Sequence, residues 1–101
     1  MARPRLGAHV PTSGGLAKRP FAYAEQILAE AIQVFVSNPR GWARTAGDPA
    51  TDDAFRTIAD DRDLATFVHS PFLINLGSPN EATYANSIGA LEHGLLRTAA
   101  I

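Results

Sequence analysis

Three short apolar runs, separated by helix-like stretches, constrain the fold of this chain more than any other feature. They cover residues 6–10, 31–36 and 65–68, contain β-branched or aromatic side chains, and are bounded by turn-forming residues. Runs of this length and composition are typical of buried strands. Because a helix-like stretch follows each run, the chain predicts the order β-α-β-α-β-α, an α/β fold built from parallel βαβ units.

The three helical stretches carry different start signals. Pro20 marks either a kink or the true start of the first helix, because the residue before a proline avoids the helical region. Thr51 is the predicted cap of the second helix, with Phe55, Ile58 and Ala59 on one face. For the third helix, about residues 79–99, the predicted start is a capping box from Ser78 to Glu81, followed by an apolar stripe of Tyr84, Ile88, Leu91, Leu95 and Ala99.

Composition indicates a soluble globular chain of 101 residues, one domain or a piece of a larger one. With 46% hydrophobic residues, 19% charged residues and no cysteine, it excludes a disordered tail and a disulfide scaffold. No run approaches a membrane span or the apolar core of a signal peptide, so we expect a cytoplasmic protein. The net charge of −1 neither supports nor excludes a phosphate-bearing partner.

Polar side chains follow each predicted strand, where α/β proteins place their sites. The first run ends at His9, the second leads into Asn38, Arg40 and Trp42, and the third ends at His69. His69 is the sharpest candidate, because an imidazole at a strand end can offer one nitrogen to a metal. The alternative is a histidine satisfied by a loop carbonyl.

The other candidates also keep two interpretations. Asn38, Arg40 and Trp42 suit a phosphate backbone, or form a loop held by packing of the tryptophan. Phe72 and Leu73 form an exposed wedge that unstacks bases, or pack beneath their own loop. For His9 the choice is a core histidine or one that supports the site or touches a phosphate, and His93 is expected on the surface.

No complete catalytic centre is present in the sequence. A catalytic zinc normally takes three protein ligands, whereas this chain offers two well-placed histidines and no carboxylate at a strand end. It also lacks a nucleophile–base pair and the glycine-rich phosphate loops. Either the chain is not an enzyme, or other parts of the enzyme are missing.

Three sequence blocks resemble a known family. They are GAHVxxSGGL at 7–16, AIQVFxxNPRxW at 31–42 and VHSPFLINL at 68–76. In order and spacing they are similar to the N-terminal third of endonuclease IV, the type 2 family of apurinic/apyrimidinic endonucleases. The resemblance implies a TIM barrel whose carboxyl face carries three zinc ions, and cleavage of double-stranded DNA 5′ to abasic sites in base excision repair.

Carried over residue by residue, the resemblance assigns His69 as a zinc ligand. It places Arg40, Phe72 and Leu73 in the DNA at the damaged site, with Asn38 on the same DNA-binding loop as Arg40, and it places His9 near the site as a residue that does not bind the metal. Phe72 stands where some members have tyrosine, and Leu28 stands where members often have a glycine that closes the first helix. Full-length members are expected to be monomers and not to bind membranes.

A barrel needs about 250 residues. The resemblance therefore implies that residues 1–101 are the truncated N-terminal part of one TIM-barrel domain, a partial barrel of three parallel strands that is inactive alone. One sheet face would then lack the strands that normally cover it. Two alternatives stay open, which are a piece of a sugar isomerase or epimerase barrel and a non-enzymatic βα interaction module.

Overall fold

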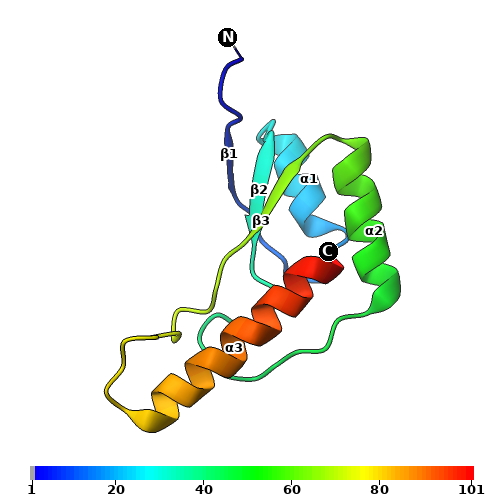
Figure 1. Ribbon diagram of the computed structural model, residues 1–101. Coiled ribbons are helices and arrows are strands. Elements are labelled where there is room, and N and C mark those ends of the chain that lie inside the picture. The colour runs from blue at the N-terminus through cyan, green and yellow to red at the C-terminus, as the bar shows by residue number, and fades with distance from the viewer. Residues whose placement is uncertain (1) are drawn as a thin grey trace.

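The computed structural model describes residues 2–101 and contains three βα units in succession (Figure 1). The elements are, in chain order, β1 (Gly7–His9), α1 (Arg19–Gln26), β2 (Ala31–Val34), α2 (Pro49–Asp61), β3 (Ala65–Val68) and α3 (Glu81–Ala100). The predicted alternation of strands and helices is confirmed. No helix within this described part of the chain has both the length and the apolar character of a membrane span.

The strands form one parallel sheet in the order β1-β2-β3. His9 lies opposite Gln33, and Gln33 lies opposite Phe67. β3 has the predicted limits, whereas β2 ends at Val34 instead of Val36. The reason is the length of its neighbours: the last bonds to β2 come from the amides of Val10 and His69, which donate to Gln33 and Val34.

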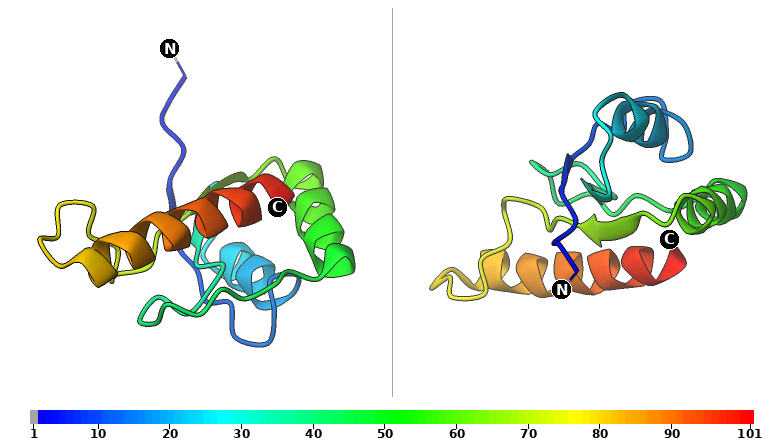
Figure 2. Two further views of the ribbon diagram at one scale, coloured as in Figure 1. Left: turned by 60° about the horizontal axis from the view of Figure 1, so that its bottom comes forward. Right: turned by 90° about the horizontal axis from the view of Figure 1, so that it is seen from above.

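The hydrophobic core lies on the helix side of the sheet. Ile32 and Val34 are fully buried there against α1 and α2. Phe21 of α1 and Phe55 of α2 meet above them with ring centroids 5.0 Å apart. The three helices follow one another in an arc around this side (Figure 2). The predicted apolar face of α2 is confirmed, since Phe55 and Ala59 are buried.

The opposite sheet face is open. Phe67 is 57% exposed, and His9, on the same row of residues beyond Gln33, is also exposed. Side chains alternate between faces along a strand, so the residues next to the buried Ile32 and Val34 point to this open side. It is the face that the resemblance assigns to the interior of a barrel.

Both helix caps predicted from the sequence are wrong. α2 is capped by Asp48, whose carboxylate accepts hydrogen bonds from the Thr51 amide at 2.9 Å and the Thr51 hydroxyl at 2.7 Å. α3 is capped by Asn80, which accepts from the Thr83 amide at 2.9 Å. Ser78 instead accepts from the Asn80 amide, so its hydroxyl organises the loop before the helix.

The apolar stripe of α3 does not face the core. Tyr84, Ile88 and Leu95 are 47%, 37% and 62% exposed. The buried positions are Ser87, Gly89, Ala90 and Arg97, because small side chains let the helix approach its neighbours and Arg97 reaches a partner on α2. His93 is half-buried with an enclosed Nε2 atom, so its expected surface position is also wrong.

The first helix starts at Arg19, with Pro20 buried in its first turn and no kink. Its end explains the expectation of glycine at position 28. Leu28 has a φ of +56°, and the amides of Leu28 and Ala29 donate to the carbonyls of Glu25 and Ala24. This is a Schellman motif, in which glycine normally occupies the left-handed position.

Candidate functional site

Four aromatic side chains from the three βα units gather at the carboxyl edge of the sheet. The ring of Phe35 lies 4.5 Å from His9, 5.0 Å from His69 and 5.4 Å from Phe72, measured between centroids. His9 and His69 are 6.1 Å apart by the same measure. The parallel sheet thus places both predicted histidines in one cluster, on the open side of the molecule.

The hydrogen bond of His69 determines which ring nitrogen is available. Its Nδ1 atom lies 2.5 Å from the backbone oxygen of Ser70, at the end of β3. A carbonyl oxygen only accepts, so Nδ1 carries the proton and Nε2 keeps its lone pair. Histidines that bind metals are oriented by a second hydrogen bond of this kind. This geometry is therefore compatible with both interpretations of His69, a metal ligand and a histidine satisfied by a loop carbonyl.

His9 has a similar arrangement but a side-chain partner. Its Nδ1 atom lies 3.3 Å from the Oε1 atom of Gln33, the residue opposite it in the sheet. If Nδ1 is the donor, its Nε2 also retains a lone pair. The hydrogen-bond partner of His9 is thus Gln33, and its contact with His69 is one of ring packing.

The two loops that carry the predicted DNA-binding residues are joined by their backbones. The amide of Phe72 donates to the carbonyl of Pro39 at 2.8 Å. Within the first loop, the amide of Arg40 donates to the side-chain oxygen of Asn38 at 3.0 Å. The side chains of Asn38 and Arg40 are exposed, so this loop presents an amide and a guanidinium to solvent.

Phe72 and Leu73 protrude from the second loop. They are 57% and 36% exposed, although Phe72 also packs edge-on against Phe35 and His69. The loop is attached to α3 by Ser87, whose hydroxyl accepts from the Asn75 amide at 2.8 Å. Neither protruding side chain is buried, so the sugar isomerase alternative, which expects both in a pocket wall, gains no support.

The chain is similar in sequence to known proteins. No protein-family model matches the chain. The chain is 47% identical over 97 residues to "Probable endonuclease 4" of Streptomyces avermitilis, covering 96% of this chain and 31% of that protein. It is 46% identical to the Streptomyces coelicolor protein of the same name, covering 100% of this chain and 34% of that protein. The chain is homologous to endonuclease IV.

The fold agrees with that family. The crystal structure of endonuclease IV from Thermus thermophilus matches with a TM-score of 0.85 and 30% identity, covering 96% of this chain and 36% of that one. The three βα units therefore match part of the endonuclease IV TIM barrel. The chain spans about a third of the length of the relatives it matches.

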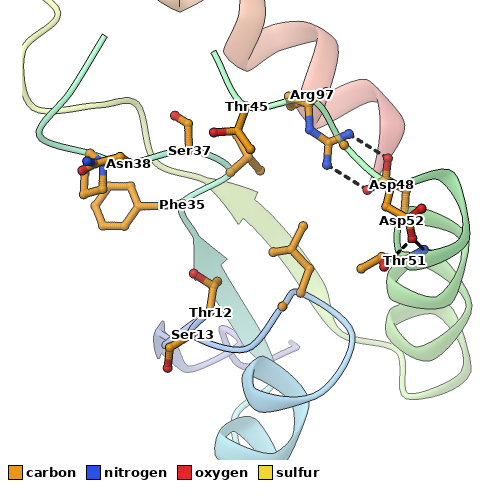
Figure 3. A pocket seen from close by; sticks show the side chains of 16 residues that line it. Thr12, Ser13, Phe35, Ser37, Asn38, Thr45, Asp48, Thr51, Asp52 and Arg97 are labelled. Atoms are coloured by element: carbon orange, nitrogen blue, oxygen red, sulfur yellow. Dashed lines mark hydrogen bonds and ion pairs between the residues drawn. The ribbon is translucent and has the colours of Figure 1, made fainter. Parts of the chain in front are cut away.

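A cleft beside the cluster has a volume of about 590 Å³ (Figure 3). It lies between the β1–α1 loop, the β2–α2 loop and the start of α2, and Phe35 and Asn38 line one end. Gly15 lines this cleft, and the φ angles of Gly14 and Gly15, +85° and +111°, allow the tight turn there.

Charged groups at the other end of the cleft form an ion pair. Arg97 donates to both carboxylate oxygens of Asp52, at 2.7 and 2.8 Å, and both side chains are about nine-tenths buried. These hydrogen bonds lower the pKa of Asp52 and raise that of Arg97. Hydrogen bonds from Thr51 likewise lower the pKa of Asp48. The pairing indicates a structural role.

The metal site implied by endonuclease IV is only partly represented. Among residues 2–101 no three histidine, cysteine, aspartate or glutamate side chains are placed to hold one metal ion. The Nε2 atom of His69 suits one ligand position, but this chain by itself does not fit a zinc centre.

Sequence reasoning missed Phe35 and Ser87. Phe35 follows Ala31 and Gln33 at a spacing of two, and this alternation was the available signal that it faces the open side. Nothing in the sequence indicated the role of Ser87, because a polar residue on a helix is normally exposed. Ser87 is buried because the loop that contains Asn75 packs over it.

Proposed function

We propose that the protein to which these three βα units belong is a zinc-dependent endonuclease of DNA base excision repair. Its substrate would be double-stranded DNA, cleaved at the phosphodiester 5′ to an abasic site. Support comes from the 46–47% identity to proteins named "Probable endonuclease 4" over 96% or more of this chain. The expected location is the cytoplasm.

The observation that carries the proposal is the arrangement at the carboxyl edge of the sheet. His69 presents a free Nε2 lone pair directly beside Phe72, whose ring centroid lies 5.7 Å from the imidazole. The Phe72 amide is bonded to the loop that bears Arg40. A potential metal ligand, an exposed wedge and an exposed cation therefore share one edge.

The wedge and the cation suit damaged DNA. An abasic site lacks one base, so the gap in the stack can receive an apolar side chain at a lower unstacking cost than an intact step. In this proposal Phe72 and Leu73 enter that gap, while Arg40 and Asn38 bind the phosphate backbone through charge-assisted and amide hydrogen bonds.

His69 would provide one zinc ligand. Further ligands must come from outside residues 2–101, because the described residues contain no set of three. His9 would hold the site's shape from its place beside Phe35, or contact a phosphate. The 101-residue chain alone is therefore expected to recognise the lesion weakly and to cleave nothing.

A binding measurement tests the DNA part. Fluorescence anisotropy would compare a duplex that contains one tetrahydrofuran abasic analogue with the same duplex intact. We expect the chain to prefer the abasic duplex, and Phe72→Ala or Leu73→Ala to remove most of that preference. Tyr84→Ala is the matched control, because Tyr84 is also an exposed aromatic residue, at 47%, but belongs to α3 and not to the loop that carries the wedge. Equal affinity for both duplexes would contradict the wedge.

A chimaera tests the metal and the reaction. This chain would replace the matching third of the Streptomyces coelicolor relative. The two sequences align over all 101 residues of this chain. We expect zinc-dependent nicking 5′ to the abasic site, lost in His69→Ala and retained in His93→Ala. Nicking by the isolated chain, or full activity of the His69→Ala chimaera, would overturn the ligand assignment.

A further inference from the structure

Two side chains fix the path of the β2–α2 loop along α3. A side chain at Gly89 of α3 would occupy the space that holds the Arg44 guanidinium, and one at Gly47 would overlap the Arg97 guanidinium. Arg44 from the loop therefore lies against α3 at Gly89, and Arg97 from α3 lies against the loop at Gly47. Figure 1 shows this segment running beside α3 before it enters α2.

The segment between these two points runs along α3. Positions 89 and 97 are eight residues apart on α3, which corresponds to about 12 Å along a helix. Three steps of chain from residue 44 to residue 47 span at most about 11 Å when fully extended. The long side chains of Arg44 and Arg97 bridge the space between loop and helix at either end. Contact at both points therefore keeps this segment alongside α3.

This segment joins the start of α2 to the loop that bears Asn38 and Arg40. Downstream, Asp48 begins α2 directly after Gly47. Upstream, Trp42 is half-buried, and Asn38 and Arg40 occupy the part of the loop that is bonded to Phe72 through Pro39. The loop is thus attached to α3 on one side and to the Phe72 loop on the other.

We propose that Arg44 and Gly89 position the β2–α2 loop for binding to abasic DNA, with Gly89 kept free of a side chain so that the Arg44 guanidinium can lie against α3. This inference rests on the proposed function. Arg44 and Gly89 act through Asn38 and Arg40, so they are positioning residues. Glycine is a poorer helix former than alanine, and at position 89 the lack of a side chain leaves the space that the Arg44 guanidinium occupies.

The chain offers a matched pair of helical glycines for the test. Gly89→Ala places a methyl group against the Arg44 guanidinium, whereas a Cβ at Gly94 on the same helix meets nothing within 4 Å. Both substitutions improve helix propensity equally, so a difference between them reports the loop. Arg44→Ala removes the other partner, and Arg44→Lys tests whether the planar guanidinium itself is needed.

Trp42 provides a readout independent of DNA, because it is the single tryptophan of the chain and lies two residues before Arg44. We expect its emission to move to longer wavelength in Gly89→Ala and Arg44→Ala and to stay unchanged in Gly94→Ala. Affinity for the abasic duplex should fall about three- to thirtyfold in the first two, a range typical of residues that act without touching the ligand. The double variant should be no worse than Arg44→Ala.

The outcomes separate this inference from the proposed function. Identical Trp42 emission in Gly89→Ala and Gly94→Ala would overturn the positioning role, as would a Gly89→Ala loss of affinity with unchanged emission. If the unaltered chain shows no preference for abasic DNA, the proposed DNA contact fails, and the role of Gly89 in positioning the loop for DNA fails with it. The emission comparison would then show whether Arg44 still seats the loop.

Discussion

The ion pair between Asp52 and Arg97 is the clearest place to test how the helices are held together. Asp52→Asn keeps the shape of the side chain and removes its charge. Both partners are about nine-tenths buried, with side-chain exposures of 8% and 11%, so solvent screens the remaining Arg97 charge poorly. Removing one member of a buried pair costs about 3–5 kcal/mol.

We expect a value near the lower end of that range, about 3 kcal/mol, because the asparagine oxygen can retain one of the two hydrogen bonds. With a urea slope of about 1–3 kcal/mol per molar, the unfolding midpoint followed by circular dichroism should fall by about 1 M or more. Asp53→Asn is the matched control, since Asp53 is the neighbouring acid and is 68% exposed in its pair with Arg56. Its cost should stay below about 1 kcal/mol.

Acid provides a second measurement of the same pair. The Arg97 hydrogen bonds lower the pKa of Asp52 from its ordinary 3.8. A lowered folded-state pKa contributes stability above the unfolded value, and this contribution is lost as the pH falls through the folded value. Stability of the unaltered chain should therefore decline below about pH 4 more steeply than that of Asp52→Asn. Equal midpoints for Asp52→Asn and Asp53→Asn would refute the reasoning.

Three other predictions follow from local geometry. Leu28→Gly should raise the unfolding free energy by about 0.5–1 kcal/mol in urea titrations, because Leu28 has a φ of +56°, whereas Leu28→Ala keeps the strain and should not. Asn80→Ala should lower it by about 1 kcal/mol through loss of the α3 cap, and Ser78→Ala by less. The Glu30 carboxyl should titrate near pH 2 by NMR, since hydrogen bonds from Arg3 and the Leu6 amide lower its pKa to about 2. Its contribution to stability is present above the ordinary 4.5 and is lost as the pH falls toward 2, so Glu30→Gln should flatten acid unfolding in that range.

Local patterns were sufficient for some of the fold and site. The run at 65–68 predicts β3 to the residue, because a short apolar run bounded by turn formers has few alternatives, although β3 is half-buried or exposed along its length. The same argument places His9 and His69 at strand ends, since parallel strands bring their carboxyl ends to one edge. Homology to endonuclease IV was likewise readable from three short blocks, because those residue combinations are specific.

Helix caps and helix faces were less predictable. Thr51 and Asp48 are both good caps, and Pro49 directly after Asp48 was the local signal for the earlier start, because proline favours the first helical position. The stripe from Tyr84 to Ala99 has the helical period, but periodicity identifies an apolar face without naming what covers it. In this chain the side of α3 toward the sheet is made of small residues, and the stripe stays exposed.

What the sequence alone determined was the order of strands and helices, the homology to endonuclease IV, and the histidines at the strand ends. These features follow from the spacing of residues close together in the sequence, which does not depend on how the chain packs. Only the tertiary structure decided that Phe35 joins His9 and His69, that Arg97 neutralises Asp52, and that Gly89 leaves space for Arg44. Each of these contacts joins residues that are far apart in the sequence, and their meeting depends on how the helices pack around the sheet.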